Sequence, residues 1–245
     1  CVPEAAGTWF AGATATVFAG FKWYCILVVA LFLFFAVYLM FSRFGSIRLG
    51  DDDQVPEFGY FAWFSMLFSA GMGIGLVFWS IAEPMYHLQG NPFVTEGMTP
   101  EAAQMAMRLT FFHWGLHPWA IYVIVGLSLA FFSYRRKLPL AIRSVLYPIL
   151  GERIYGFWGH AADVLAVFGT VFGVATSLGL GVSRMNTGLN QMFGMEVSQQ
   201  SQLWLIGGIS LIATLSAISG VGRGVKILSE LNIWLSAFIL ALFLV

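Results

Sequence analysis

Three glycines at every second position, Gly71, Gly73 and Gly75, interrupt an apolar stretch that is long enough to cross a lipid bilayer. Glycine costs roughly 1 kcal/mol per residue in a helix interior, so this spacing favours a local break in the helix. Within a bilayer, a break is tolerated only where the freed N–H and C=O groups line a cavity or bind something. We therefore interpret the three glycines as part of a candidate ligand site. A GxxxG packing face formed by Gly71 and Gly75 is the alternative.

Aromatic side chains in the next apolar stretch have the chemistry to bind a cation. At about 100° per residue, Trp119 and Tyr122 share a helix face, and Trp114 lies within one helix width of Tyr122. Aromatic faces attract cations, especially quaternary ammonium groups. An aromatic belt at the membrane surface explains Trp114 as well, but it explains Tyr122 poorly because that residue lies near mid-span. Pro118 is expected to kink this helix.

Other polar residues in the apolar stretches have simpler interpretations. His113 and His117 are spaced i, i+4, as two metal ligands on one helix face would be, but no carboxylate or cysteine accompanies them on that helix. Glu83 stands before Pro84, and we expect that pair to end the broken helix. The hydroxyl of Thr170 either bonds to a carbonyl of the preceding turn or serves as a hard oxygen ligand for an alkali cation.

The composition is that of an integral membrane protein. Of the 245 residues, 59% are hydrophobic and 10% are charged, whereas an average soluble domain carries about 25% charged residues. The net charge of zero gives no reason to expect a nucleic-acid partner. Cys25 lies in an apolar helix, so we expect no structural disulfide. An intramembrane enzyme would need paired carboxylates, or histidines with a carboxylate, at mid-membrane, and the stretches contain no such set.

Apolar runs near 20 residues predict about six transmembrane helices in one all-α domain, 1–245. The predicted spans are 23–42, 59–82, 109–133, 161–184, 203–220 and 229–245. Residues 1–22 are expected to form an external loop or a short interfacial helix. The chain starts without methionine and ends inside an apolar run, so we expect a fragment of a longer protein.

Lysine and arginine placement predicts the orientation of these spans. Nine of the 12 basic residues fall on one set of connecting loops, which should be cytoplasmic. On that side, the connector 134–160 is expected to contain short interfacial helices broken at Pro148 and Gly151. Asp51, Asp52 and Asp53 are interpreted as a solvated face.

Four segments in the same order resemble the betaine/choline/carnitine transporter (BCCT) family. They are AGMGIGLVFWSIAEP (70–84), FFHWGLHPWAIY (111–122), GTVFGVATSLGLGV (169–182) and SAISGVGRGVKILSELN (216–232). The resemblance implies a leucine-transporter-like inverted-repeat fold, of which this chain holds the first repeat plus one preceding helix. It also implies a multi-pass protein of the cell inner (plasma) membrane and a homotrimer.

The resemblance further implies a function and the residues that perform it. The expected function is ion-coupled uptake, by alternating access, of a betaine-like quaternary ammonium zwitterion such as glycine betaine. Alternatives are a proton-coupled choline or carnitine transporter or exchanger, and a non-transporting sensor or channel. The residues implied to bind the substrate are the aromatic box of Trp114, Trp119 and Tyr122, the glycines Gly71, Gly73 and Gly75, and Phe78 near the permeation path.

No organic cofactor is expected, and either sodium or a proton is the coupling ion. In sodium-coupled relatives, one sodium site uses the backbone carbonyls at the positions of Ser69 and Met72, and a second uses a hydroxyl at the position of Thr170. Its partner hydroxyl falls on Val174, which has no oxygen to offer. Choline-carrying members often have aspartate where this chain has Gly75, so a substrate with its own carboxylate is expected.

Overall fold

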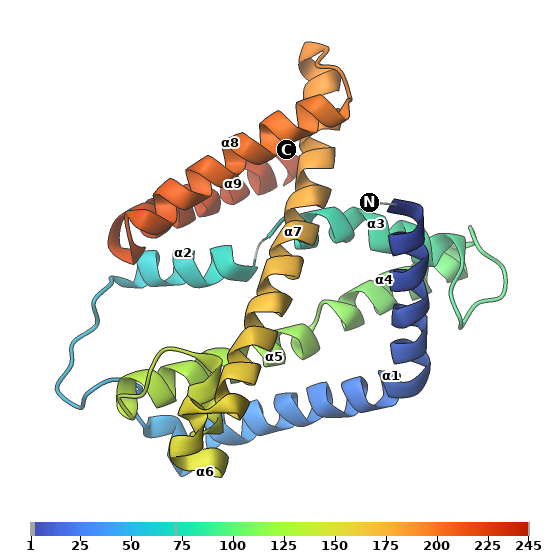
Figure 1. Cartoon of the computed structure of the whole chain (residues 1–245). Helices are drawn as coiled ribbons and strands as arrows, with labels where there is room; N and C mark the ends of the chain where they lie inside the picture. Colours follow the sequence, from blue (N-terminus) through green and yellow to red (C-terminus); the bar gives the residue numbers. More distant parts are fainter. Residues whose placement is uncertain (1–2, 72, 245) are drawn as a thin grey trace. The chain divides into compact units, whose positions relative to one another are not determined.

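The computed structural model describes residues 3–71 and 73–244, which form helices and loops without a β-strand (Figure 1). The α-helices are α1 (Pro3–Phe41), α2 (Tyr60–Gly71), α3 (Ile74–Gln89), α4 (Pro100–His113), α5 (Leu116–Ala130), α6 (Tyr147–Leu150), α7 (Phe157–Phe193), α8 (Gln199–Ile218) and α9 (Lys226–Leu244). Five helical stretches are long and apolar enough to cross a membrane, and the bent pair of α2 and α3 adds a sixth. The predicted all-α membrane class, with about six spans, is confirmed.

The chain divides into two compact units, and each has its own helix packing. The first takes in the residues up to Asp53 together with Met107–Asp163, and the second takes in Gln54–Ala106 and the residues from Val164 onward. In the first unit α1 packs against α5, and in the second α2 packs against α9. Buried apolar side chains are mostly alanines, such as Ala62 in α2 and Ala120 in α5. Small residues let helix backbones approach closely, which is how helices associate in lipid.

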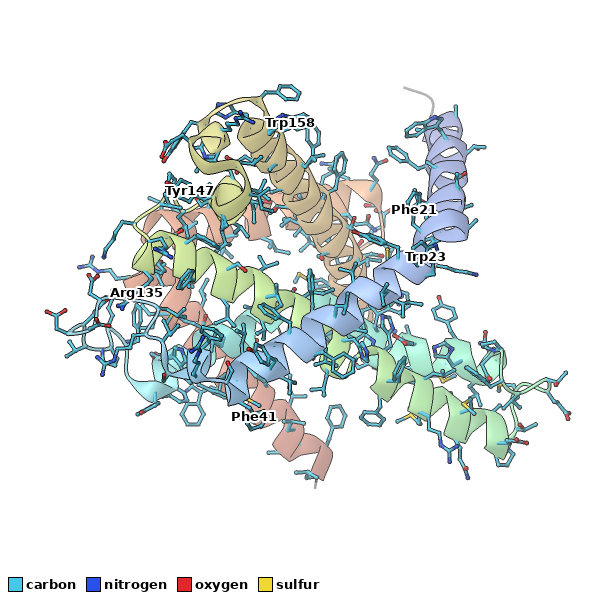
Figure 2. The ribbon with its side chains drawn as sticks, turned by 90° about the horizontal axis from the view of Figure 1, so that it is seen from below. Phe21, Trp23, Phe41, Arg135, Tyr147 and Trp158 are labelled. Carbon is cyan, nitrogen blue, oxygen red and sulfur yellow. The ribbon has the colours of Figure 1, made fainter. Side chains whose placement is uncertain are left out.

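The first helix is longer than predicted. α1 begins at Pro3, so most of the segment expected as a loop or separate short helix is part of one continuous helix. Figures 1 and 2 show that α1 changes direction part-way along, and Phe21 and Trp23 mark the region of the bend in Figure 2. The predicted span from residue 23 therefore corresponds to the part of α1 after the bend.

Two predicted helix breaks lie elsewhere in the structure. Pro118 occupies the first turn of α5, where a missing N–H costs no helical hydrogen bond, and the break falls at Trp114 and Gly115. A Cβ on Gly115 would lie 2.8 Å from the carbonyl oxygen of Phe111, so this break requires glycine. Pro84 is inside α3, which continues to Gln89, so Glu83 does not end the broken helix.

The connector between α5 and α7 belongs to the first unit and packs within it. It holds α6 and the short 3-10 turns Ile142–Leu146 and Gly151–Tyr155, as predicted for this segment, and Gly151 adopts a left-handed φ of 53° at the break. Asp163, near the start of α7, accepts the backbone N–H of Arg143 at 2.9 Å and pairs with its Nε at 3.2 Å. These contacts fix the connector to the first turns of α7.

The loop after α1 is tied to the end of α5 by ion pairs. Arg135 pairs with Asp52 at 2.7 Å, and Lys137 pairs with Asp51 at 2.9 Å. Arg135, labelled in Figure 2, also donates from Nη1 to the carbonyl of Gly50 at 3.0 Å. Two of the three aspartates therefore connect separate elements of the first unit, while all three side chains stay exposed, as expected of a solvated face.

Candidate functional site

The glycine-rich stretch is a break between two helices, as its spacing predicts. α2 ends at Gly71, Gly73 is the extended residue before α3, and Gly75 lies in the first turn of α3. The two helices are bent by 49°. The N–H of Gly73 donates to the carbonyl of Gly71 at 3.0 Å. Met72, one of the predicted sodium ligands, lies outside the described residues.

Neither steric crowding nor backbone conformation accounts for the glycines at 73 and 75. Gly73 has φ −93° and ψ 175°, which any residue adopts. A Cβ built on Gly73 or Gly75 meets no atom within 4 Å. Gly75 therefore does not form a GxxxG contact with the described residues. What the two glycines provide is a weakened helix with open space beside it, which agrees with the ligand-site interpretation.

The end of α2 is anchored to α9 just before the break. Asn232 Nδ2 donates to Ser69 Oγ at 3.1 Å, and Ser69 Oγ donates to the carbonyl of Ser229 at 3.4 Å. Ser69 lies on the same face of α2 as the buried residues Ala62 and Ser65. The Ser69 hydroxyl thus serves the α2–α9 interface, which leaves its backbone carbonyl as the group for an ion. The contact of Asn232 with Ser69 was not predicted from the sequence.

A cavity of about 660 Å³ lies beside the break, within the second unit. Gly73 and the apolar side chains of α3 form one wall, Gly181 and Arg184 of α7 form another, and Asn232 of α9 contributes a polar group. Ligand cavities of roughly 300–1,000 Å³ with mostly apolar walls and few polar groups suit small organic ligands. Phe78, a predicted substrate residue, lines this cavity together with Gly73.

Arg184 is the charged residue among those that line this cavity. From the sequence, it was counted only among the three basic residues that lie outside the loops predicted to be cytoplasmic. Its guanidinium carbon lies 4.4 Å from the centroid of the Phe78 ring, in cation–π contact. A signal was present, because Arg184 is the one charged residue in the sequence 164–193. Ionisable residues inside transmembrane segments are expensive and mark functional sites.

The aromatic residues predicted as a cation box lie in the first unit. Trp119 and Tyr122 face each other on α5 with ring centroids 5.9 Å apart. Trp114 precedes α5, and its carbonyl accepts the indole N–H of Trp119 at 3.2 Å. The ring of Trp114 lies 5.1 Å from that of His113. The structure therefore brings Trp119 and Tyr122 together as a pair, while Trp114 contributes a backbone contact.

The remaining polar candidates form contacts within their helices. Thr170 Oγ1 donates to the carbonyl of Ala166 at 2.8 Å, the bond to the preceding turn that the sequence allows. His87 Nε2 lies 3.5 Å from the buried carboxylate of Glu83, one turn away on α3. Among residues 3–71 and 73–244, no group of three His, Cys, Asp or Glu side chains is placed to hold a metal ion.

Comparison with known proteins decides the family. The model of the betaine/carnitine/choline family transporters matches residues 1–245. The chain belongs to this family. Its relatives include glycine betaine transporters of Bacillus subtilis, 49% identical over 95% of the chain, and Acinetobacter baylyi, 51% identical over 90% of it. A glycine betaine/proline/choline/ectoine transporter of Vibrio parahaemolyticus is 46% identical over 87% of the chain.

This BCCT chain spans less than half the length of those curated relatives. It covers 46% of the Bacillus subtilis protein, 33% of the Acinetobacter baylyi protein and 38% of the Vibrio parahaemolyticus protein. The match confirms the family assignment made from the four sequence segments. With its apolar helices, the chain is a multi-pass protein of the plasma membrane. The family and the names of the relatives point to a transporter rather than an enzyme.

Proposed function

We propose that the full-length protein takes up a betaine-like quaternary ammonium zwitterion, with glycine betaine as the first candidate, by ion-coupled alternating access and without a covalent step. The observation that carries this proposal is the helix break at Gly73, which opens on a cavity of about 660 Å³. Broken transmembrane helices that line a cavity are where transporters bind substrates and coupling ions. Relatives that carry the glycine betaine name support the choice of substrate.

The aromatic pair on α5 supplies the second part of the proposed recognition. The rings of Trp119 and Tyr122 are 37% and 61% exposed, so both have faces free of other side chains in the described chain. Trimethylammonium groups bind such faces because the ring quadrupole attracts positive charge and no hydrogen bond is needed. We assign Trp119 and Tyr122 to the ammonium end of the substrate, with Trp114 holding the Trp119 ring.

Sodium is the proposed coupling ion. Ser69 lies in the last turn of α2, whose carbonyl oxygens have no partner further along the helix, and carbonyl oxygens next to a helix break are the kind of ligand that a hard monovalent cation takes in transporters. Thr170 keeps lone pairs on a hydroxyl that donates to its own helix, but Val174 offers no second hydroxyl. Proton coupling, and choline or carnitine as substrate, form the alternative proposal. The homotrimer stays a prediction from the family resemblance.

Transport by the full-length protein in proteoliposomes tests the function. Labelled glycine betaine should accumulate in the vesicles when a sodium or proton gradient is imposed, with saturable kinetics and competition from unlabelled glycine betaine. Empty vesicles give the background. Flux that only equilibrates the labelled solute and does not saturate would indicate a channel, and binding without uptake would indicate a sensor.

A further inference from the structure

Phe78 and Arg184 form a pair on the wall of the cavity beside the helix break. The two residues come from the start of α3 and the C-terminal half of the long helix α7, and both line the same cavity. The guanidinium carbon of Arg184 lies over the Phe78 ring, 4.4 Å from the ring centroid. The pair places a fixed positive charge at an otherwise apolar wall.

No carboxylate of the described residues neutralises the charge of Arg184. Arg184 is exposed, and among residues 3–71 and 73–244 no carboxylate forms an ion pair with it, whereas Arg143 pairs with Asp163 at 3.2 Å. An aromatic face holds a guanidinium in place but accepts none of its in-plane N–H bonds. Among the described residues, Arg184 forms no hydrogen bond to a protein group, so its N–H donors are available to a ligand that enters the cavity.

The helix break adds a second positive element to the same cavity. Gly73 caps α3 without a side-chain hydrogen bond, and its backbone lines the cavity. The first-turn N–H groups of a helix have no partner within the helix and carry a partial positive charge. No acidic side chain is among the residues that line the cavity. A ligand group with negative charge is the electrostatic complement of these two elements.

We propose that Arg184 receives the carboxylate of the transported zwitterion and is a specificity-determining residue, an inference that rests on the proposed function. A planar guanidinium binds a carboxylate through two parallel hydrogen bonds, which lysine or glutamine cannot reproduce. Asn232 offers a further polar group in the cavity. A substrate such as choline, which has no carboxylate, gains nothing from Arg184 and faces an uncompensated positive charge.

This assignment changes the role of Phe78. The guanidinium covers one face of the Phe78 ring, and that face is therefore closed to the ammonium group of a substrate. Phe78 is then a positioning residue that holds Arg184 by its aromatic face. The carboxylate end of the substrate is then the part that binds at Arg184.

Substrate competition in proteoliposomes with the full-length protein tests the proposal. In Arg184→Gln, the concentration of glycine betaine that halves labelled uptake should rise about 10- to 100-fold, because a charge-assisted bidentate pair is lost. The corresponding concentration of choline should stay within about twofold, or fall. Arg184→Lys should lie between wild type and Arg184→Gln. Arg223→Gln, an exposed arginine outside the cavity, is the matched control and should change neither value.

The ratio of the two concentrations is measured within each variant, so it does not depend on expression level. If Arg184→Gln does not fold, the same ratio in Arg184→Lys and in Phe78→Leu decides the question, with a shift toward choline expected in both. An unchanged ratio in the variants that fold overturns the role of Arg184 while leaving the transport function in place. Wild-type protein that takes up neither solute would instead overturn the proposed function.

Discussion

At the scale of single residues, Trp119 is both a proposed ligand-binding ring and a hydrogen-bond donor. Its indole N–H reaches the carbonyl of Trp114 at 3.2 Å, which fixes the ring next to Tyr122. We predict that Trp119→Ala in the full-length protein weakens glycine betaine binding roughly tenfold or more, since a desolvated cation–π contact contributes up to about 2 kcal/mol. Trp119→Phe keeps a ring face but loses the N–H bond, so its effect should be smaller.

Competition uptake and tryptophan-fluorescence titration in proteoliposomes measure this effect. Trp204→Ala is a suitable control because Trp204 is an exposed tryptophan of α8, where no partner ring contacts it in the described chain. If Trp119→Ala folds and binds glycine betaine as wild type does, the assignment of Trp119 to the ammonium group is wrong.

Contacts within one helix could be predicted from the sequence, whereas contacts between residues on different helices could not. The pairing of Trp119 with Tyr122 follows from helix periodicity, because both residues belong to one turn of one helix. The contacts of Phe78 with Arg184, and of Ser69 with Asn232, join residues on different helices, the latter pair separated by 163 positions. No spacing rule relates such residues. A lone arginine in an apolar helix was the available signal, and it indicates function without indicating a partner.

At the scale of elements, the helix break has room for a side chain at Gly73, so a substitution there should leave folding intact. The same substitution should still impair uptake. A Cβ on Gly73 would meet no atom within 4 Å, and its φ of −93° suits alanine. Gly73→Ala should therefore leave expression and thermal stability unchanged. Because Gly73 lines the cavity, the added methyl should still weaken glycine betaine uptake, roughly tenfold or more by the usual effect of one methyl group in a binding site.

The measurement is the concentration dependence of uptake, together with the unfolding temperature of the purified protein. Gly169→Ala, in α7, also places its Cβ in open space but lies away from the cavity, and it serves as the control. Lost stability in Gly73→Ala would mean that the glycine is needed for folding. Unchanged uptake would mean that no ligand approaches this part of the backbone.

Local sequence rules predicted the elements well where one residue determines the outcome, and less well where neighbours compete. The glycine break appears at the predicted residues because the cost of glycine in a helix is local. The kink expected at Pro118 appears at Gly115, since proline is harmless in a first turn while Gly115 alone avoids the Phe111 carbonyl. The start of α1 was missed because small residues such as Gly12 and Gly20 lower helix propensity without preventing a helix.

The ion pair between the loop after α1 and the end of α5 predicts a pH effect. The guanidinium of Arg135 hydrogen-bonds to Asp52 and lowers the pKa of that carboxyl below its ordinary value. A lowered pKa in the folded state means that the pair contributes its stability above the unfolded value of about 3.9. That contribution is lost as the pH falls through the lower, folded pKa. The loop should therefore stay attached throughout the physiological range and loosen only in strong acid.

Asp52→Asn removes the charge and should loosen the loop already at pH 7. Hydrogen–deuterium exchange of residues 47–53, corrected for the intrinsic rate at each pH, measures this. Asp53→Asn is the control, because no ion pair of Asp53 is present among the described contacts. Equal exchange in wild type and Asp52→Asn at pH 7 would show that the bond from Arg135 to the Gly50 carbonyl holds the loop without the ion pair.

At the scale of the whole molecule, the proposed uptake is driven by an ion gradient, and residues of this chain bear on which ion is used. The α2–α9 contact fixes Ser69 in the last turn of α2, where backbone carbonyls lack helical partners and where the sodium site is proposed. Thr170 carries a hydroxyl on α7, whereas Val174 one turn later presents only methyl groups. A single sodium site beside the break is thus better supported than a second site on α7.

We predict that replacing external sodium by potassium, at fixed pH and membrane potential, abolishes most glycine betaine uptake by the full-length protein. Val174→Thr supplies the missing hydroxyl one turn from Thr170. It should raise the Hill coefficient of uptake for sodium, since it adds an oxygen ligand. Val171→Thr adds a hydroxyl on a different face of the same helix and is the control. Uptake that persists in potassium and collapses with a protonophore would establish proton coupling instead, because the driving gradient would then be that of protons.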